Sequence, residues 1–161
     1  MSLLLNRCTD VPVRELAAGE VLVSEGTRTG AMFVVASGNF EVSRQGSVVA
    51  TINDRGVVLG EISVVLDTDH GATVTATSPA TVHVIDDPVG FVVGDPEVSL
   101  EIARVLARRL NRLVAYLADV KAQYADAGGH LGLLDEVLSE LTFGEQAPVE
   151  PGSERDPDPY Y

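Results

Sequence analysis

The first half of the chain alternates short apolar runs with turns that contain glycine. The runs are rich in Val, Ile and Thr, and each is only a few residues long. The turn pairs between them are Glu25-Gly26, Ser37-Gly38, Gln45-Gly46 and Arg55-Gly56. Gly38 and Gly46 can adopt positive φ and can therefore link paired strands tightly. Such regular spacing is typical of a β-sandwich or barrel, with a last strand over residues 82–85.

The second half of the chain has the signals of helices. Asp87-Pro88 begins a short helical segment that is expected to reach Val93. Asp95-Pro96-Glu97 combines a capping Asp, a first-turn Pro and an early acid, which is a strong helix start. Gly128-Gly129 is the matching stop signal. The sequence therefore predicts one long helix over residues 96–127, following a β-region over residues 1–95.

One face of this predicted helix carries a regular apolar stripe. Its members are Ala103, Leu106, Leu110, Leu113, Leu117, Val120 and Tyr124. The alternating steps of three and four residues favour a helix–helix seam. The stripe can pair with a second copy of the chain, or it can pack on the strands. We favour a homodimer, because Ile102, Val105 and Val114 offer a separate apolar flank to the strands.

The remaining residues divide into two segments. Residues 128–143 predict a short amphipathic helix with Leu131, Leu134, Leu138 and Leu141 on one face. Residues 144–161 are polar, acidic and rich in Pro, so we expect a disordered tail. Only about thirty residues follow the long helix, which is too few for a DNA-binding module.

Composition narrows the class of protein. The chain has 161 residues, 45% of them hydrophobic, which suits one domain with an ample core. A formal charge of −13 disfavours direct contact with nucleic acid. One cysteine, Cys8, excludes an internal disulfide, and no apolar run is long enough to span a membrane. The chain is therefore expected in the cytoplasm, and its preference for Arg over the single Lys121 suggests a bacterium.

The segment 60–76, GEISVVLDTDHGATVTA, resembles the ligand cassette of the cyclic-nucleotide-binding domain family. Gly60-Glu61 opens the cassette and Ala72-Thr73-Val74 closes it. The resemblance extends over the segment from Val13 to Tyr124. This segment is similar to the sensor domain of catabolite activators, without their DNA-binding module. It implies an α+β fold: an antiparallel β-roll, or jelly roll, followed by a short helix and a long C-terminal helix. In that family the long helix both covers the nucleotide and pairs with its twin.

The resemblance also implies the roles of the site residues. Glu61 would accept the ribose 2′-hydroxyl, because an ionised carboxylate is a strong acceptor. Gly71, Ala72 and Thr73 would donate neutral hydrogen bonds to the phosphate. The implied ligand-binding residues are Gly60, Glu61, Ile62, Ser63, His70, Gly71, Ala72 and Thr73.

The chain departs from the family pattern at one position, because His70 stands where the family has its phosphate-binding arginine. Histidine is only partly protonated at neutral pH. His70 either contacts the phosphate or is an exposed loop histidine that remained after the arginine was lost. An arginine of the long helix could also supply the missing charge; the candidates are Arg104, Arg108, Arg109 and Arg112.

Two functions follow from these observations. The chain is either a cyclic-nucleotide-binding regulatory module that acts on a separate effector protein, or a degenerate relative that serves as a dimeric scaffold. The candidate ligands are cAMP and cGMP, and no other cofactor is implied. The histidines His70, His83 and His130 lack the spacing of a metal cupin, and no phosphate-binding loop or zinc motif occurs. We therefore expect no catalytic residue, no metal site and no enzyme activity.

Overall fold

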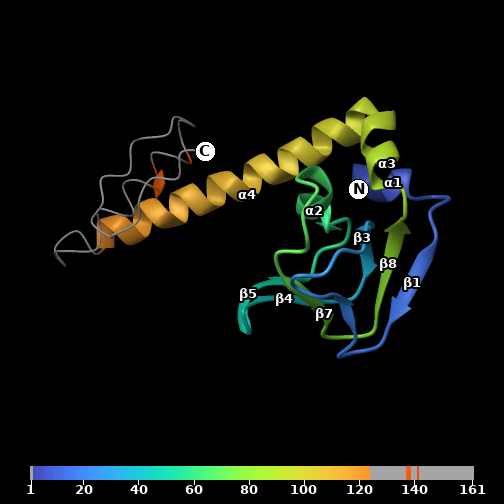
Figure 1. Ribbon diagram of the computed structural model, residues 1–161, viewed down its shortest axis with the longest axis horizontal. Coiled ribbons are helices and arrows are strands. Elements are labelled where there is room, and N and C mark those ends of the chain that lie inside the picture. Colours follow the sequence, from blue (N-terminus) through green and yellow to red (C-terminus); the bar gives the residue numbers. More distant parts are fainter. Residues whose placement is uncertain (1, 124–136, 139–140, 142–161) are drawn as a thin grey trace. The chain divides into compact units, whose positions relative to one another are not determined.

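The computed structural model describes residues 2–123, 137–138 and 141. The chain divides into two compact units, Met1–Ala103 and Arg104–Tyr161, which are described separately. The elements are, in chain order, α1 (Leu3–Arg7), β1 (Val13–Leu16), β2 (Val21–Val23), β3 (Met32–Ser37), β4 (Phe40–Arg44), β5 (Ser47–Ile52), β6 (Val58–Leu59), α2 (Glu61–Val65), β7 (Thr73–Ala76), β8 (Ala80–Ile85), α3 (Pro88–Gly94) and α4 (Pro96–Gln123) (Figure 1).

The eight strands form two antiparallel sheets of four. One sheet has the order β1-β8-β3-β6 and the other has the order β2-β7-β4-β5. Both sheets contribute to one buried apolar cluster, which is how two sheets packed face to face share a core. Its members are Leu16, Leu22, Val23, Ala31, Phe33, Val35, Phe40, Leu59, Val74, Ala76, Ala80 and Val82. The predicted antiparallel β-roll is confirmed.

Glycines make the predicted turns between neighbouring strands. Gly38 links β3 to β4 with φ of 90°, and a Cβ there would lie 2.4 Å from the Ala80 Cβ. Gly46 links β4 to β5 with φ of 77°, next to Gln45 at 50°. These backbone conformations are costly for residues with a side chain, so the two glycines fix the hairpin geometry.

An N-terminal helix that the sequence analysis did not predict packs against the roll. Leu4 of α1 is buried, and α1 contacts β3. Cys8 follows the helix and is fully buried, and burial raises the pKa of its thiol. Arg7 at the end of α1 forms ion pairs with Asp95 at 2.7 Å and Glu97 at 2.5 Å. The N-terminal segment is therefore part of the folded domain.

Both predicted helix starts after the strands are found. The Asp87 carboxylate accepts a hydrogen bond from the Gly90 N–H at 3.0 Å at the start of α3. The Asp95 carboxylate accepts one from the Glu97 N–H at 2.8 Å at the start of α4. The long C-terminal helix is described to Gln123, so its predicted end at 127 lies outside the described residues.

The apolar stripe of α4 belongs to the second unit from Leu106 onward. Leu110 and Leu113 are exposed, whereas Leu106, Leu117 and Val120 are partly buried. Tyr124, the tail over 144–161 and most of the segment 128–143 lie outside the described residues. The helix–helix interface that this apolar stripe predicts therefore stays a prediction. No helix within the described part of the chain combines the length and apolar character needed to cross a bilayer.

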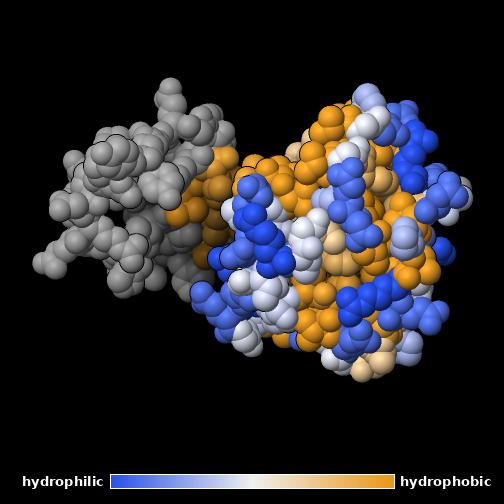
Figure 2. Space-filling view, turned by 45° about the vertical axis from the view of Figure 1, so that its right-hand side comes forward, coloured by the Kyte–Doolittle hydropathy of each residue, from blue (hydrophilic) through white to orange (hydrophobic). Residues whose placement is uncertain are grey.

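Apolar side chains also reach the surface of the roll (Figure 2). Val48 and Val49 of β5 are exposed on the edge strand of the second sheet. Further exposed apolar residues lie on α2 and α3, beside the segment that resembles a ligand cassette.

Candidate functional site

A left-handed glycine opens the candidate site. Gly60 follows β6 with φ of 82° and occupies the N-cap position of α2. A Cβ at this position would lie 3.2 Å from the Ala31 carbonyl oxygen and 3.4 Å from Cε1 of His70. Glycine is therefore favoured here both by backbone conformation and by close packing.

Glu61 is the first residue of α2 and only 2% of it is exposed. A carboxylate in the first helical turn interacts favourably with the N-terminal end of the helix dipole. No buried side-chain oxygen or nitrogen among the described residues lacks a hydrogen-bond partner. A ligand can reach the Glu61 carboxylate only after neighbouring groups move.

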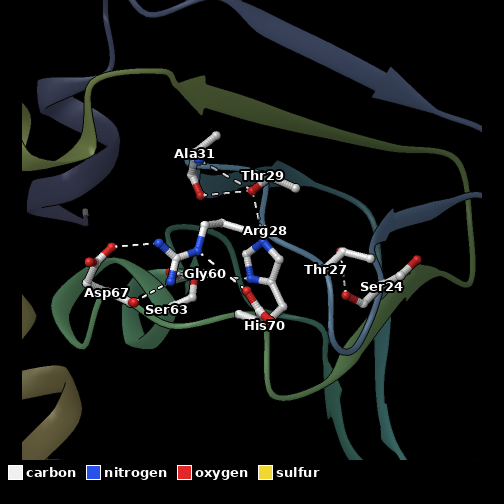
Figure 3. Close-up of polar contacts among 10 residues, drawn as sticks. Ser24, Thr27, Arg28, Thr29, Ala31, Gly60, Ser63, Asp67 and His70 are labelled. Carbon is white, nitrogen blue, oxygen red and sulfur yellow. Dashed lines mark hydrogen bonds and ion pairs between the residues drawn. The ribbon is translucent and has the colours of Figure 1, made fainter.

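His70 is buried beneath this glycine, with 5% of its surface exposed (Figure 3). Its Nε2 lies 2.8 Å from the Thr29 hydroxyl oxygen, and its Nδ1 lies 3.1 Å from the Ser63 hydroxyl oxygen. Its backbone N–H donates to the Thr27 carbonyl and its carbonyl accepts from the Gly26 N–H, both at 2.8 Å. The interpretation of His70 as an exposed loop residue is therefore wrong, because the segment 24–31 encloses it.

The hydrogen bonds around the ring have a consistent direction. The Ser63 hydroxyl donates to the Gly60 carbonyl at 2.8 Å, so its oxygen is left to accept from Nδ1–H. The Thr29 hydroxyl oxygen lies 2.8 Å from Nε2 and 3.5 Å from the Ala31 carbonyl oxygen, so its one proton is better placed to donate to Nε2, while the oxygen accepts from the Ala31 N–H at 3.3 Å. This chain of donors and acceptors fits a neutral imidazole protonated on Nδ1.

The electrostatics of His70 agree with a neutral ring. Burial lowers the pKa of His70, and the nearby Asp69 carboxylate opposes this shift to a smaller extent. Since both ring nitrogens are used within the protein, the ring offers no N–H to a ligand in this arrangement. The structure brings His70 together with Gly60 and Ser63, but it places the ring inside the domain.

The end of the cassette lies at the start of β7. The Thr73 hydroxyl oxygen accepts a hydrogen bond from the Glu25 N–H at 2.9 Å, and a hydroxyl that accepts one bond can still donate one. Gly71 is exposed, and a Cβ there would meet no atom within 4 Å. Ala72 is partly buried, whereas Ile62 on α2 is exposed. The predicted ligand residues thus lie in one loop–helix segment, but they do not all face the same way.

Arg28 is a residue of this region that the sequence analysis missed. Its Nη1 lies 2.9 Å from an Asp67 carboxylate oxygen and its Nε lies 3.4 Å from one of Asp69. Its Nη2 also donates to the Asp67 main-chain carbonyl. The guanidinium therefore joins the loop before β3 to the cassette loop. These contacts span about forty positions along the chain, so no local sequence pattern could have shown them.

The arginines from Arg104 onward belong to the second unit, so the prediction that one of them supplies the phosphate-binding charge stays untested. Within the described residues, no group of three or more His, Cys, Asp or Glu is arranged to hold a metal ion. The site thus gathers hydrogen-bonding groups in one loop–helix segment, and the His70 ring among them is engaged within the domain.

Comparison with known proteins shows which family residues 13–88 are similar to. Residues 13–88 match the family model described as the cyclic nucleotide-binding domain. The cGMP-dependent protein kinase egl-4 of Caenorhabditis elegans is 28% identical over 123 residues, which cover 70% of this chain and 16% of the kinase. The chain thus spans only a small part of that relative.

Solved structures share the fold. The catabolite activator protein of Thermus thermophilus superposes with a TM-score of 0.60 at 22% identity, over 75% of this chain and 57% of that one. A structure from a bacterial cyclic-GMP-dependent signalling pathway that regulates phytopathogenesis superposes with a TM-score of 0.58 at 23% identity, over 69% of this chain and 95% of that one. Residues 13–88 of this chain are therefore similar to the cyclic nucleotide-binding domain family, and the solved structures share its fold.

Proposed function

We propose that the chain is a cyclic-nucleotide-binding regulatory module with its cassette at residues 60–76 and cAMP or cGMP as ligand. The observation that carries the proposal is the position of Gly60 and Glu61. A left-handed glycine directly after β6 presents a helix whose first residue is an acid, within the segment that matches the family. Glu61 would accept the ribose hydroxyl once the groups around it have moved.

The phosphate would be held by the loop before β7. Gly71, Ala72 and Thr73 would supply N–H groups, and a positive charge would come from one of two residues. Either His70 leaves its two hydroxyl partners and becomes protonated, or Arg28 exchanges its carboxylate partners for the phosphate. The first route makes affinity rise as the pH falls through the histidine pKa, whereas the second leaves affinity nearly independent of pH in that range, because a guanidinium stays charged.

The output of the module would pass through α4 to a separate effector protein. Exposed Leu110 and Leu113 in the second unit support the pairing of this helix with a second copy. The net charge of −13 supports a protein partner in preference to nucleic acid. The module itself would carry out no reaction, and the lone Cys8 and the arginine-rich composition support a bacterial cytoplasmic protein.

The second candidate function is a dimeric scaffold that has lost its nucleotide. One observation favours it: both nitrogens of His70 are engaged with Thr29 and Ser63 inside the domain. In that case the family's phosphate-binding position has become part of the folded core.

A calorimetric titration with cAMP and cGMP distinguishes the two functions. It is carried out at two pH values, about one unit above and one unit below 6.5. The sensor function predicts binding, which Glu61→Gln weakens by about tenfold to a hundredfold because a charge-assisted hydrogen bond is lost. The exposed Glu15→Gln on β1 removes the same charge outside the cassette and should leave affinity unchanged. An absence of binding by either nucleotide at both pH values would establish the scaffold.

A further inference from the structure

The helix α2 turns its apolar face to solvent. Ile62, Val65 and Leu66 are all exposed, and their spacing places them on one side of the helix. Glu61, by contrast, is buried. This is the reverse of the usual amphipathic arrangement, in which the apolar stripe faces the core.

The neighbouring helix α3 continues this surface. Val89 and Val93 lie four residues apart, so they share a face, and both are exposed; Val93 is 73% exposed. The helices α2 and α3 contact each other. We call the five residues Ile62, Val65, Leu66, Val89 and Val93 the α2–α3 patch, part of the apolar surface of the roll (Figure 2). Apolar patches with polar rims mark interaction sites on soluble proteins.

The rim of the patch is acidic. The segments that flank α2 and α3 carry Asp67, Asp69, Asp86, Asp87, Asp95 and Glu97. Among the described residues, Arg28 forms ion pairs with Asp67 and Asp69, and Arg7 forms ion pairs with Asp95 and Glu97. Six carboxylates against two guanidinium groups leave a negative rim, which favours a basic partner. A second copy placed on this face by two-fold symmetry would bring two acidic rims together, which is unfavourable.

We propose that the α2–α3 patch is the docking surface for an amphipathic helix of the effector protein, with apolar anchors flanked by Lys and Arg. Such a helix would place its apolar residues on the α2–α3 patch and its cations on the acidic rim. This inference rests on the regulatory function proposed above. It places the effector's contact on α2 and α3, whereas α4 would serve the pairing with a second copy.

The position of α2 links this surface to the cassette. Its first residue is Glu61, and Ser63 on its inner side holds the His70 ring. A nucleotide that moves either residue would therefore move the docking face. Coupling of this kind is reciprocal, so effector binding would change nucleotide affinity by the same factor.

The test measures binding of a labelled model helix of leucine and lysine to the full chain by fluorescence anisotropy. Val65→Lys should weaken binding by about tenfold or more, because it places a like charge at the centre of the patch. Val48→Lys is the matched control: Val48 is 56% exposed against 54% for Val65, but it lies on β5. The control should stay within about twofold of the unmodified protein. Val93→Lys repeats the test on α3, should either variant fail to fold.

Three results would overturn the inference: no binding of the basic helix, equal weakening by Val65→Lys and Val48→Lys, or equal binding of a helix with glutamate in place of lysine. Self-association that Val65→Lys abolishes would also overturn it, because the patch would then hold a second copy. Calorimetry with cAMP and cGMP on the same samples separates the two proposals. Nucleotide binding without helix binding refutes only the docking surface, and helix binding without nucleotide binding refutes only the sensor.

Discussion

The two halves of the cassette differ in how they use their polar residues. In the first half, Gly60 and Glu61 keep the family pattern, and the glycine takes the left-handed conformation that opens α2. In the second half, the family's arginine is replaced by His70, whose ring lies inside the domain between Thr29 and Ser63. The resemblance implies a ligand-facing arginine at position 70, whereas the side chain that this chain has there faces the protein interior.

The chemistry of the two side chains explains why this is feasible. Arginine cannot lose its proton in a protein, so burying it without an anion is costly. Histidine can become neutral, and the neutral ring both donates and accepts. Two hydroxyl groups are then sufficient partners. The ionisation behaviour of the residue at position 70 therefore decides whether its side chain can be buried between the cassette loop and the loop before β3.

The largest expected effect comes from restoring the charge in the second half. His70→Arg should increase affinity for cAMP or cGMP by about tenfold to a hundredfold, because a charge-assisted hydrogen bond contributes about 1.5–3 kcal/mol. Calorimetric titration measures the change. His83→Arg places the same charge on β8, outside the cassette, and should leave affinity unchanged. An unchanged affinity for His70→Arg would show that the loop is not shaped for a phosphate.

A substitution of Gly60 tests the role of the first half of the cassette. Gly60→Ala should lower the free energy of unfolding by about 1–2 kcal/mol, because φ of 82° is unfavourable for alanine. Chemical denaturation measures this value. Gly71→Ala is the matched control, because a Cβ there meets no atom within 4 Å, and it should change stability by less than about 0.5 kcal/mol. Equal effects of the two substitutions would refute the role assigned to Gly60.

The buried histidine also predicts a pH dependence of stability. Its pKa in the folded state is lowered by burial, so between that value and about 6.5 the unfolded chain binds more protons than the folded one. Its contribution to the free energy of unfolding is complete above about 6.5 and is lost as the pH falls through the folded pKa. Denaturation at a series of pH values should show that the free energy of unfolding rises with pH in this range. His70→Gln should remove the contribution of His70 to that rise. A slope of the opposite sign would contradict the assignment.

The carboxylates with shifted pKa values do not contribute at the upper end of this window, at about pH 6.5. The Arg14 hydrogen bond lowers the pKa of Glu20, and the Glu97 N–H lowers that of Asp95. Both shifts move the carboxylates away from the pH at which the unfolded histidine takes up its proton.

The smallest effect is expected at Arg28, which joins the two loops at the surface. Arg28→Ala should lower the free energy of unfolding by less than about 1 kcal/mol, because its ion pairs are exposed and screened by salt. If Arg28 supplies the phosphate charge, however, nucleotide affinity should fall by about tenfold or more. Arg44→Ala on β4 is the control for a surface guanidinium elsewhere on the roll. Unchanged affinity would exclude Arg28 and leave His70 or an arginine of α4 as the source of the charge.

The roll was predictable from the sequence because its signals are local. The Gly38 and Gly46 turns and the Asp-Pro helix starts at 87–88 and 95–96 each depend on residues adjacent in the chain. The helix α1 was missed because its five residues carry too little periodicity, and its stability comes from packing against β3. The helix α2 was missed as well, because the resemblance placed Gly60 and Glu61 at the opening of the cassette but predicted no helix there.

The environment of His70 was not predictable from the sequence, and the physical reason is distance along the chain. Thr29 lies 41 residues from His70, and the loop that contains it has no motif of its own. Arg28 was missed for the same reason. Whether a polar residue faces a ligand or the interior is decided by such long-range partners.

The most direct test of the account is an NMR titration of the His70 ring nitrogens in the unmodified protein, with the signal assigned by its loss in His70→Gln. The account predicts a neutral ring protonated on Nδ1 near neutral pH, with a titration midpoint below about 6.5. A midpoint at or above 6.5, or a ring protonated on Nε2, would contradict a histidine held neutral between Thr29 and Ser63.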